Sequence, residues 1–343
     1  MIKGAIIGLG KIAQTAHLPA FAFESLRPRA EIIAAAEPDE QIRLEVQANY
    51  PHIKLYASAE ELIEHEKVDF IDICTPPNMH SPLIRLALSR GLHLICEKPF
   101  ALDAQESQCL AEKLRHKSSV VFVPCHQYTY SPLWSALHEF VGLARHEGSV
   151  FIQSSVYRTS SDPGIAADGK GWRMNRAVSG GGILSDTGVH YFALAEWLLG
   201  MPEEVTCRTY HLEDSAQSVE DTATVELKHP AGIFQFTLTW AADRRANLLR
   251  AVTRRRSFVY DGGVKALTFE DGACRSIITV PDASDKSQYV VLYEKLFAEF
   301  FSMIETGERQ EAHIDSALHA SLVLDAAYRS AREGTTVHIG AQR

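Results

Sequence analysis

The side chains best suited to chemistry are Asp186 and His190, which follow a run of three glycines, Gly180–Gly182. The apolar pattern after the glycines predicts a helix that runs through Leu199 and ends at Gly200. On a helix, a spacing of four residues places both side chains on one face, one turn apart. A carboxylate beside an imidazole holds one ring nitrogen protonated and leaves the other free as a base. The same spacing also suits a metal site or a structural Asp–His contact.

The N-terminus carries a pattern that is typical of dinucleotide binding. An apolar run at residues 3–7 predicts a buried strand, and a helical pattern through Leu26 follows the glycine turn. Such a turn lets the backbone approach a pyrophosphate and points a helix N-terminus at the anion. We therefore expect the turn to bind the cofactor through Gly8, Gly10, Lys11, Ile12 and Ala13.

An acidic residue follows the second predicted strand, 32–36, at Glu37. Its carboxylate is placed to accept hydrogen bonds from the adenosine ribose hydroxyls and would repel a 2′-phosphate. The position therefore favours NAD, with NADP less suited. Alternatively, Glu37 caps the next helix together with Asp39, and both interpretations can hold at once.

Helices and strands alternate up to residue 124, which predicts a doubly wound parallel sheet. The strands are expected at 69–74, 93–96 and 120–124, and the helices at 39–49, 59–66, 80–90 and 103–116. Ligands of such sheets bind at the carboxyl ends of the strands. The residues expected at the cofactor from these ends are Thr75, Pro76, Asn78, His80, Glu97 and Lys98. Lys98 suits a charged donor beside the nicotinamide, or alternatively a surface lysine.

The pattern changes after residue 125. A helix at 132–145 and a strand at 150–157 precede the glycine-led helix, and short strands with turn signals fill 204–280 before two closing helices, 291–306 and 314–333. The fold class is thus α/β: an N-terminal Rossmann domain at 1–125, and a C-terminal α+β domain at 126–343 with a large, mostly antiparallel sheet. Helices should cover one sheet face, and the other face is a candidate interface of a homodimer or homotetramer.

The bulk composition excludes several classes. The chain has 343 residues, is 46% hydrophobic and carries a net charge of −9, which argues against a nucleic-acid partner. One basic cluster, at residues 244–256, suits a solvated or subunit-facing strand pair, or alternatively an anion site. No apolar run approaches the roughly 20 residues that span a bilayer. Six cysteines without CxxC or metal spacing indicate free thiols, no metal and a cytoplasmic location.

Four motifs in order resemble the glucose-fructose oxidoreductase / inositol dehydrogenase / rhizopine catabolism (Gfo/Idh/MocA) family, over essentially the whole chain. They are Gly8-x-Gly10-x-x-Ala13 with His17-Leu18-Pro19, Thr75-Pro76 with His80, Glu97-Lys98-Pro99, and Gly180-Gly181-Gly182-x-Leu184-x-Asp186-x-Gly188-x-His190. The resemblance implies NAD(P)-dependent oxidation or reduction of a sugar, cyclitol or related polyol. It also implies a cis peptide between Lys98 and Pro99.

The same resemblance assigns the catalytic residues. His190 would be the general base, Asp186 would orient it, and Lys98 would stabilise developing alkoxide charge. The family's Arg-Phe-x-Pro is replaced here by Thr129-Tyr130-Ser131-Pro132, which weakens the substrate assignment. The expected substrate contacts are Tyr128, Tyr157, Trp172, for which core packing fits equally well, and Arg173.

Two other classes compete with this prediction. One is a non-catalytic regulator or scaffold that binds a dinucleotide on the same fold. The complete set of Lys98, Asp186 and His190 favours the enzyme, since a pseudoenzyme is free to lose a member. The other is a metal-dependent lyase using Asp186 and His190, which lacks further ligands at helical spacing and has no need of the glycine turn.

Overall fold

The computed structural model describes residues 1–144, 147–159, 171–212, 219–308 and 310–340. By its internal contacts the chain divides into two units. The first is Met1–Gln127 with Lys286–Leu318, and the second is Tyr128–Asp285 with His319–Arg343. This division differs from the predicted limits, 1–125 and 126–343, because residues 286–318 join the first unit.

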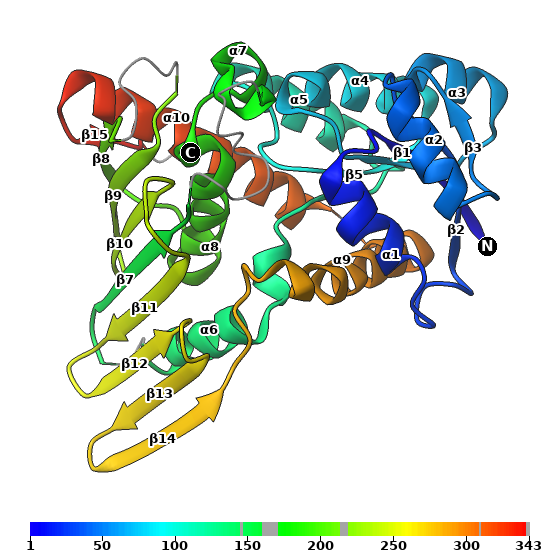
Figure 1. Cartoon of the computed structure of the whole chain (residues 1–343). Helices are drawn as coiled ribbons and strands as arrows, with labels where there is room; N and C mark the ends of the chain where they lie inside the picture. Colours follow the sequence, from blue (N-terminus) through cyan, green and yellow to red (C-terminus); the bar gives the residue numbers. More distant parts are fainter. Residues whose placement is uncertain (145–146, 160–170, 213–218, 309, 341–343) are drawn as a thin grey trace. The chain divides into compact units, whose positions relative to one another are not determined.

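The first unit is built on a six-stranded parallel sheet with the strand order β3-β2-β1-β4-β5-β6 (Figure 1). Its strands are β1 (Ile2–Ile7), β2 (Ala30–Ala36), β3 (Lys54–Tyr56), β4 (Phe70–Ile73), β5 (His93–Cys96) and β6 (Phe122–Pro124). The strand order reverses between β1 and β4, as in a doubly wound dinucleotide-binding sheet. The predicted Rossmann architecture is confirmed.

Four predicted helices of this unit occur within one residue of their expected ends: α2 (Glu40–Asn49), α3 (Ala59–His65), α4 (His80–Arg90) and α5 (Ala104–His116). The two closing helices, α9 (Lys286–Thr306) and α10 (Glu311–Glu333), of which this unit contains the start, begin five and three residues earlier than predicted, and a short 3-10 turn, η2 (Pro77–Met79), was not predicted. The helix predicted up to Leu26 is shorter. It consists of a π-helical turn, η1 (Ala13–His17), and α1 (Leu18–Ala20), after which the chain forms successive turns.

Helix α9 belongs to the first unit because its aromatic face packs beside the parallel sheet. Phe297 stacks on Phe21 with ring centroids 4.6 Å apart, and Phe300 and Phe301 lie edge-on to Phe70 of β4. All three phenylalanines of α9 are fully buried. The burial of these aromatic rings stabilises the packing of α9 in the first unit, although α9 is far from β4 in the sequence.

The second unit is built on a nine-stranded sheet with the order β14-β13-β12-β11-β7-β10-β9-β8-β15. Its strands are β7 (Val150–Tyr157), β8 (Glu204–Tyr210), β9 (Thr222–His229), β10 (Gly232–Thr239), β11 (Ala246–Val252), β12 (Arg256–Asp261), β13 (Ala266–Asp271), β14 (Cys274–Thr279) and β15 (Val337–His338). Among the described strands of this second sheet, only β7 and β10 pair in parallel, so the predicted, mostly antiparallel sheet is confirmed.

The second unit also contains helices and short helical turns. They are η3 (Gln127–Tyr130), α6 (Pro132–Ala144), η4 (Trp172–Met174), α7 (Arg176–Ser179), η5 (Leu184–Gly188) and α8 (Val189–Leu199), with the rest of α10. Strand β10 alternates buried and half-buried residues, and its Phe236 contacts Tyr191 and Phe192 of α8.

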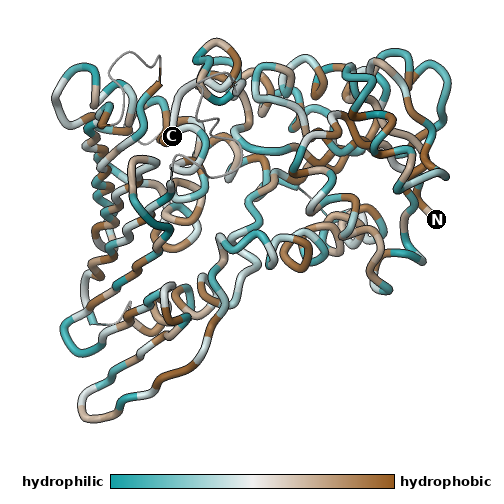
Figure 2. Tube along the Cα trace, viewed as in Figure 1, coloured by the Kyte–Doolittle hydropathy of each residue, from teal (hydrophilic) through white to brown (hydrophobic). Residues whose placement is uncertain are grey.

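Strand β14 is exposed along its whole length. Ile277 and Ile278 leave 59% and 54% of their surface open, and Figure 2 shows this stretch as hydrophobic. In the basic cluster nearby, five arginines are exposed, and Arg256 instead pairs with Glu147 and Asp271. This arrangement matches the predicted solvated strand pair.

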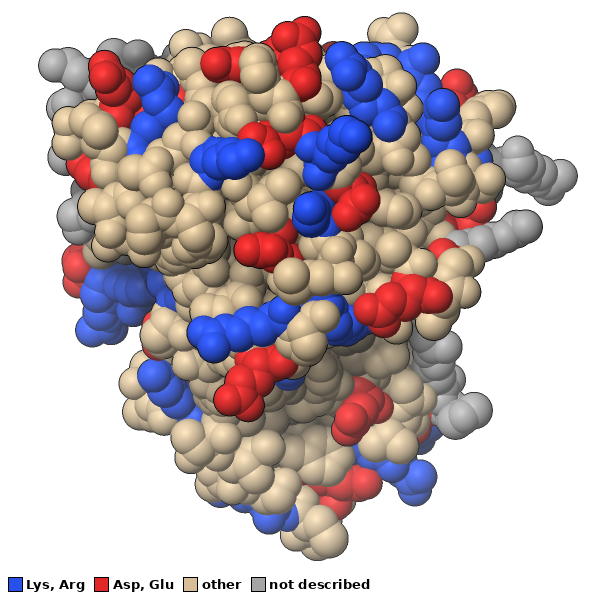
Figure 3. Space-filling view, turned by 90° about the vertical axis from the view of Figure 1, so that its right-hand side faces the viewer, with Lys and Arg blue, Asp and Glu red and all other residues tan. Residues whose placement is uncertain are grey.

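Surface properties add three observations. On the face in Figure 3, Lys and Arg residues are interspersed with Asp and Glu residues. Within the described ranges, none of the helices has the length and apolarity needed to cross a bilayer. All six cysteines are free thiols, as predicted.

Candidate functional site

The predicted cofactor residues of the first unit lie along one edge of the parallel sheet. The glycine turn follows β1, Glu37 follows β2, Thr75 follows β4, and Glu97-Lys98 follows β5. Since all these strands are parallel, their carboxyl ends share that edge. The residues therefore flank the point between β1 and β4 where the strand order reverses.

The two glycines of the turn differ in their surroundings. Gly8 has φ +89°, and a Cβ on it would lie 2.9 Å from the backbone carbon and oxygen of Cys74. A Cβ on Gly10 would meet nothing within 4 Å. Gly8 is thus needed for the packing of β1 against the end of β4, whereas Gly10 leaves open space beside the backbone. Such space is what the predicted contact with a pyrophosphate requires.

Glu37 is 8% exposed, and its carboxylate forms hydrogen bonds with the backbone at the glycine turn and at the start of the next helix. Its Oε2 accepts the Leu9 amide at 2.8 Å, and its Oε1 accepts the Asp39 amide at 3.1 Å. The cap of α2 is formed by the Asp39 side chain, which accepts the amides of Gln41 and Ile42. Glu37 accepts the amide of this capping residue, so both residues take part at the start of α2, as the alternative predicted, with Asp39 as the capping side chain. An ionised carboxylate has further lone pairs, so the ribose assignment fits this geometry.

His80 ties together two of the predicted cofactor loops. The side chain is fully buried, with Nδ1 2.7 Å from the Pro99 carbonyl oxygen and Nε2 3.0 Å from that of Thr75. Burial lowers the pKa of His80. Asn78 is exposed, and Pro76 is half-buried. His80 thus connects the loop after β4 to the loop after β5.

Glu97 is buried at the end of β5, and Lys98 beside it is half-buried. Burial alone would raise the pKa of Glu97, but the hydrogen bond and charge of His17, followed by the charge of Lys98, lower it to about 2. The carboxylate also accepts the hydroxyl of Tyr293. The peptide bond between Lys98 and Pro99 is cis, as the family resemblance implies.

In the second unit, the glycine-led helix begins with a π-helical turn. The turn η5 holds Asp186, and α8 then carries His190 near its start. Single π turns inside helices are frequent at functional sites. Asp186 is half-buried, whereas His190 is 5% exposed. The predicted helix is therefore present, with a wider first turn than the pattern suggested.

Two side chains named in the sequence contact this pair. Asp186 accepts a hydrogen bond from Arg173 Nε at 3.1 Å, and the Arg173 guanidinium lies 4.2 Å from the ring centroid of Trp172. The ring of Tyr128 lies 4.5 Å from that of His190. Tyr157 is half-buried at the end of β7, and Trp172 is 36% exposed. Arg173 therefore pairs with Asp186, a contact that the sequence did not predict.

Sequence reasoning missed Glu220, a buried carboxylate behind the glycines. Its Oε1 accepts the amides of Gly182 and Leu184 at 3.0 and 3.1 Å, and the hydroxyl of Tyr328 at 2.8 Å. Its backbone oxygen accepts the Ile183 amide at 3.0 Å. Glu220 has no local motif, since it lies more than 30 residues beyond the turn that it holds.

Potential metal ligands gather elsewhere. Among the described residues, the groups with suitable atoms are His17, Asp72 and Cys74, and His17, Glu97 and Cys125. Neither group contains Asp186 or His190. The geometry thus gives no further ligands for the metal-dependent lyase considered above.

Together, the doubly wound sheet, the glycine turn and the acidic residue after β2 define a dinucleotide-binding oxidoreductase fold. Residues 2–124 match the model of an oxidoreductase family with an NAD-binding Rossmann fold, and residues 148–276 match the Gfo/Idh/MocA C-terminal domain. The chain belongs to the Gfo/Idh/MocA family and is an NAD(P)-dependent dehydrogenase acting on CH–OH groups.

Relatives and solved structures agree with this assignment. D-apiose dehydrogenase of Paraburkholderia graminis is 27% identical, covering 98% of this chain and 89% of the relative. D-glucoside 3-dehydrogenase of Escherichia coli is 23% identical over 74% of each chain. An oxidoreductase from Agrobacterium radiobacter, solved with NAD+, L-tartaric acid and magnesium, has a TM-score of 0.85 at 20% identity, covering 100% of this chain and 99% of that one. Levoglucosan dehydrogenase with NADH and levoglucosan has a TM-score of 0.83 at 19% identity, covering 98% and 99%.

Proposed function

We propose that this protein oxidises a secondary alcohol of a sugar, cyclitol or related polyol, or reduces the corresponding ketone, with His190 as the general base. The observation that carries the proposal is the position of His190, which follows the turn that holds Asp186 and whose ring lies 4.5 Å from that of Tyr128. When bound, the nicotinamide supplies the hydride acceptor or donor. The relatives named above act, by name, on sugars, which supports this substrate class.

Each proposed catalytic residue has a distinct part. His190 takes the hydroxyl proton as the hydride leaves, and Lys98 stabilises the developing negative charge on oxygen. Asp186 stabilises the protonated imidazole, and its ion pair with Arg173 keeps it in one orientation. The indole of Trp172 offers an apolar surface for a sugar ring, as well as packing under Arg173.

We further propose that NAD is preferred over NADP. The carboxylate of Glu37 is fixed by the amides of Leu9 and Asp39, so it cannot turn away from a 2′-phosphate without losing both hydrogen bonds. The resulting repulsion discriminates against NADP.

Assembly and location are proposals of the same kind. The exposed apolar residues of β14 support a homodimer or homotetramer through the second sheet. The free thiols support a cytoplasmic location, because the reducing conditions of the cytoplasm keep thiols from forming disulfides.

The test is NADH formation from NAD across a panel of sugars, cyclitols and sugar acids, measured by absorbance. His190→Ala should abolish turnover and leave NAD affinity unchanged. The matched control is His229→Ala, because His229 is equally buried in the same unit and its Nδ1 hydrogen-bonds only to the Gly200 carbonyl. Equal loss of activity in both variants would contradict the role of His190. Silence across the panel with intact NAD binding would favour the non-catalytic alternative.

A further inference from the structure

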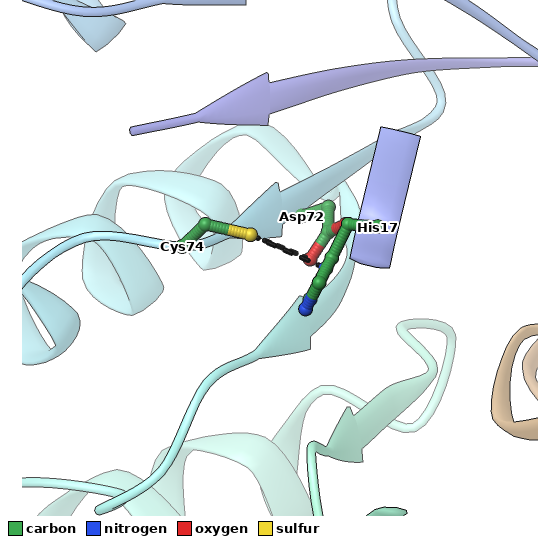
Figure 4. Close-up of side chains that lie close together, drawn as sticks. All are labelled: His17, Asp72 and Cys74. Atoms are coloured by element: carbon green, nitrogen blue, oxygen red, sulfur yellow. Dashed lines mark hydrogen bonds and ion pairs between the residues drawn. The ribbon is translucent and has the colours of Figure 1, made fainter. Parts of the chain in front are cut away.

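The first unit contains a buried cluster of ionisable side chains from separate elements. His17 comes from the π turn η1 and Asp72 from β4 (Figure 4), and Glu97 directly follows β5. His17 and Asp72 are 0% exposed, and Glu97 is 7% exposed. His17 Nδ1 lies 2.7 Å from Asp72 Oδ2, and its Nε2 lies 3.2 Å from Glu97 Oε1. The histidine thus bridges two carboxylates.

This geometry indicates where the protons are. An ionised carboxylate only accepts hydrogen bonds, so both ring nitrogens of His17 must carry a hydrogen to face two of them. Glu97 also accepts the Tyr293 hydroxyl and the Lys98 backbone amide, and these contacts keep it ionised. Burial lowers the pKa of His17, but Asp72 first and then Cys74 outweigh burial and raise it well above its usual value.

The charges of the cluster nearly balance. The positive charge of His17 offsets one of the two buried carboxylates, and Lys98 beside Glu97 offsets the other. The remaining titratable neighbours are thiols, a phenol and two histidines, and burial lowers the pKa values of the histidines, His80 and His126, and keeps them neutral. Burial raises the pKa values of Cys74, Cys96, Cys125 and Tyr293 and keeps these groups neutral. A neutral residue in place of His17 would leave two carboxylates together without a cation between them.

A metal ion is the competing occupant. Cys74 Sγ lies 3.2 Å from His17 Nδ1, and ligand atoms of His17, Asp72 and Cys74 all lie within 4.8 Å of one another. A metal would require both a thiolate and a deprotonated ring nitrogen. Burial opposes the thiolate, and a nitrogen 2.7 Å from a carboxylate oxygen has the separation of a charge-assisted hydrogen bond.

We propose that His17 is a buried imidazolium clamped between Asp72 and Glu97, and that this clamp holds Glu97 and, through it, the backbone at Lys98 in one position. His17 is then a positioning residue for Lys98. Its effect on catalysis rests on the proposed function, because that proposal places Lys98 at the reacting oxygen. The clamp itself is independent of any substrate.

The first experiment uses the protein without cofactor. Imidazole ¹⁵N resonances of His17, assigned through contacts with the Tyr293 ring 4.1 Å away, should show both nitrogens protonated at neutral pH. His93 is the internal reference, because its Nδ1 accepts the Val121 amide and must be unprotonated. In His17→Gln, hydrogen exchange of the Lys98 amide should accelerate about tenfold or more, whereas His93→Gln should leave it unchanged.

The second experiment uses the pH profile of kcat, which a merely structural defect would not move. In His17→Gln, the two carboxylates repel each other and the pKa of one of them rises. A new acidic limb of kcat should therefore appear, with KM much less affected. Adding Asp72→Asn removes the second carboxylate, so the limb should return towards lower pH. If His17→Gln does not fold, Tyr293→Phe provides a milder loosening of Glu97 with the same exchange readout.

The outcomes separate the two proposals. A neutral His17 in the resonance experiment, or unchanged Lys98 exchange in the variants, would overturn the clamp even if the enzyme is active. Stoichiometric zinc or iron in the purified protein, lost in Cys74→Ser, would also overturn it. A protonated His17 with accelerated exchange in His17→Gln supports the clamp even if no substrate in the panel reacts, and only the proposed function then fails.

Discussion

Removal of the Glu220 carboxylate should loosen the glycine turn that precedes Asp186. Three donors converge on its Oε1: the amides of Gly182 and Leu184 and the hydroxyl of Tyr328. Glu220→Ala leaves all three without this acceptor inside a buried site. Each unsatisfied buried donor costs about 1–3 kcal/mol, and water entering the vacated space recovers part of that. We expect a loss of about 3 kcal/mol in the free energy of unfolding of the second unit.

Two further variants calibrate this value. Tyr328→Phe removes a single donor and should cost about 1 kcal/mol. Glu220→Gln retains an oxygen acceptor and should cost less than about 1 kcal/mol relative to the native side chain. Tyr210→Phe, at an exposed tyrosine of β8, is the matched control and should change nothing measurable.

The chain offers a convenient probe for this measurement. All its tryptophans lie in the second unit, so tryptophan fluorescence during urea unfolding reports on that unit. The residues are Trp134, Trp172, Trp197 and Trp240. Activity should fall through kcat in the same order, Glu220→Ala, then Tyr328→Phe, then Glu220→Gln. The reasoning is refuted if Glu220→Ala costs no more than Tyr328→Phe, because the acceptor would then not serve three donors.

Three other predictions use the same measurements. Gly10→Ala should leave the free energy of unfolding unchanged and weaken NAD binding, measured by calorimetry, at least about tenfold. Gly8→Ala should destabilise the first unit by about 1–2 kcal/mol or more, because Gly8 has a positive φ and lies against the Cys74 backbone. Similar stabilities of the two variants would contradict this contrast. Glu37→Gln should narrow the preference for NAD over NADP in kcat/KM, and an unchanged ratio would exclude Glu37 as its source. Burial lowers the pKa of His229 to about 4, so the unfolded chain binds more protons between pH 6.5 and 4, and stability should fall as the pH falls through that window. The shift of about 2.5 units corresponds to about 3 kcal/mol at most, and His229→Gln should flatten the dependence in urea titrations at several pH values.

The architecture could be predicted because most helices and strands have a recognisable hydrophobic pattern within their own residues. Parallel strands such as β1 and β4 are mostly apolar and buried, and strands of the second sheet such as β10 alternate buried and half-buried residues. The elements that were missed lack such patterns. Strand β3 has three residues, none of them buried, β15 has only two, and β11 begins in the arginine-rich cluster. The placement of α9 in the first unit depends on aromatic packing between distant segments, which periodicity cannot reveal.

The candidate site was predictable where it depends on the backbone. Glycines, strand ends and the Lys98-Pro99 peptide have local signatures, so their positions follow from the sequence. Contacts between side chains do not. No periodicity in the sequence relates Arg173 to Asp186, so their ion pair could not be predicted. Glu220 lies far along the chain from the glycines whose amides it accepts. His17 was noted in the sequence only as part of a motif, and its contacts with two carboxylates were not predicted.

Three buried glutamates share a task that explains their positions. Glu37 accepts backbone amides of the first glycine turn, Glu220 accepts those of the second, and Glu97 accepts the amide of Lys98. Loops that leave room for a ligand cannot satisfy their own amides through regular structure, so buried acceptors must do so. The other partners given above for Glu37 and Glu220 are neutral, whereas Glu97 lies in one cluster with a second buried carboxylate, Asp72. Of these three glutamates, Glu97 is therefore the one that requires a neighbouring cation. A planar imidazolium has two opposed N–H groups and fits a fully buried space between two acceptors, whereas the longer side chains of lysine and arginine would need more room.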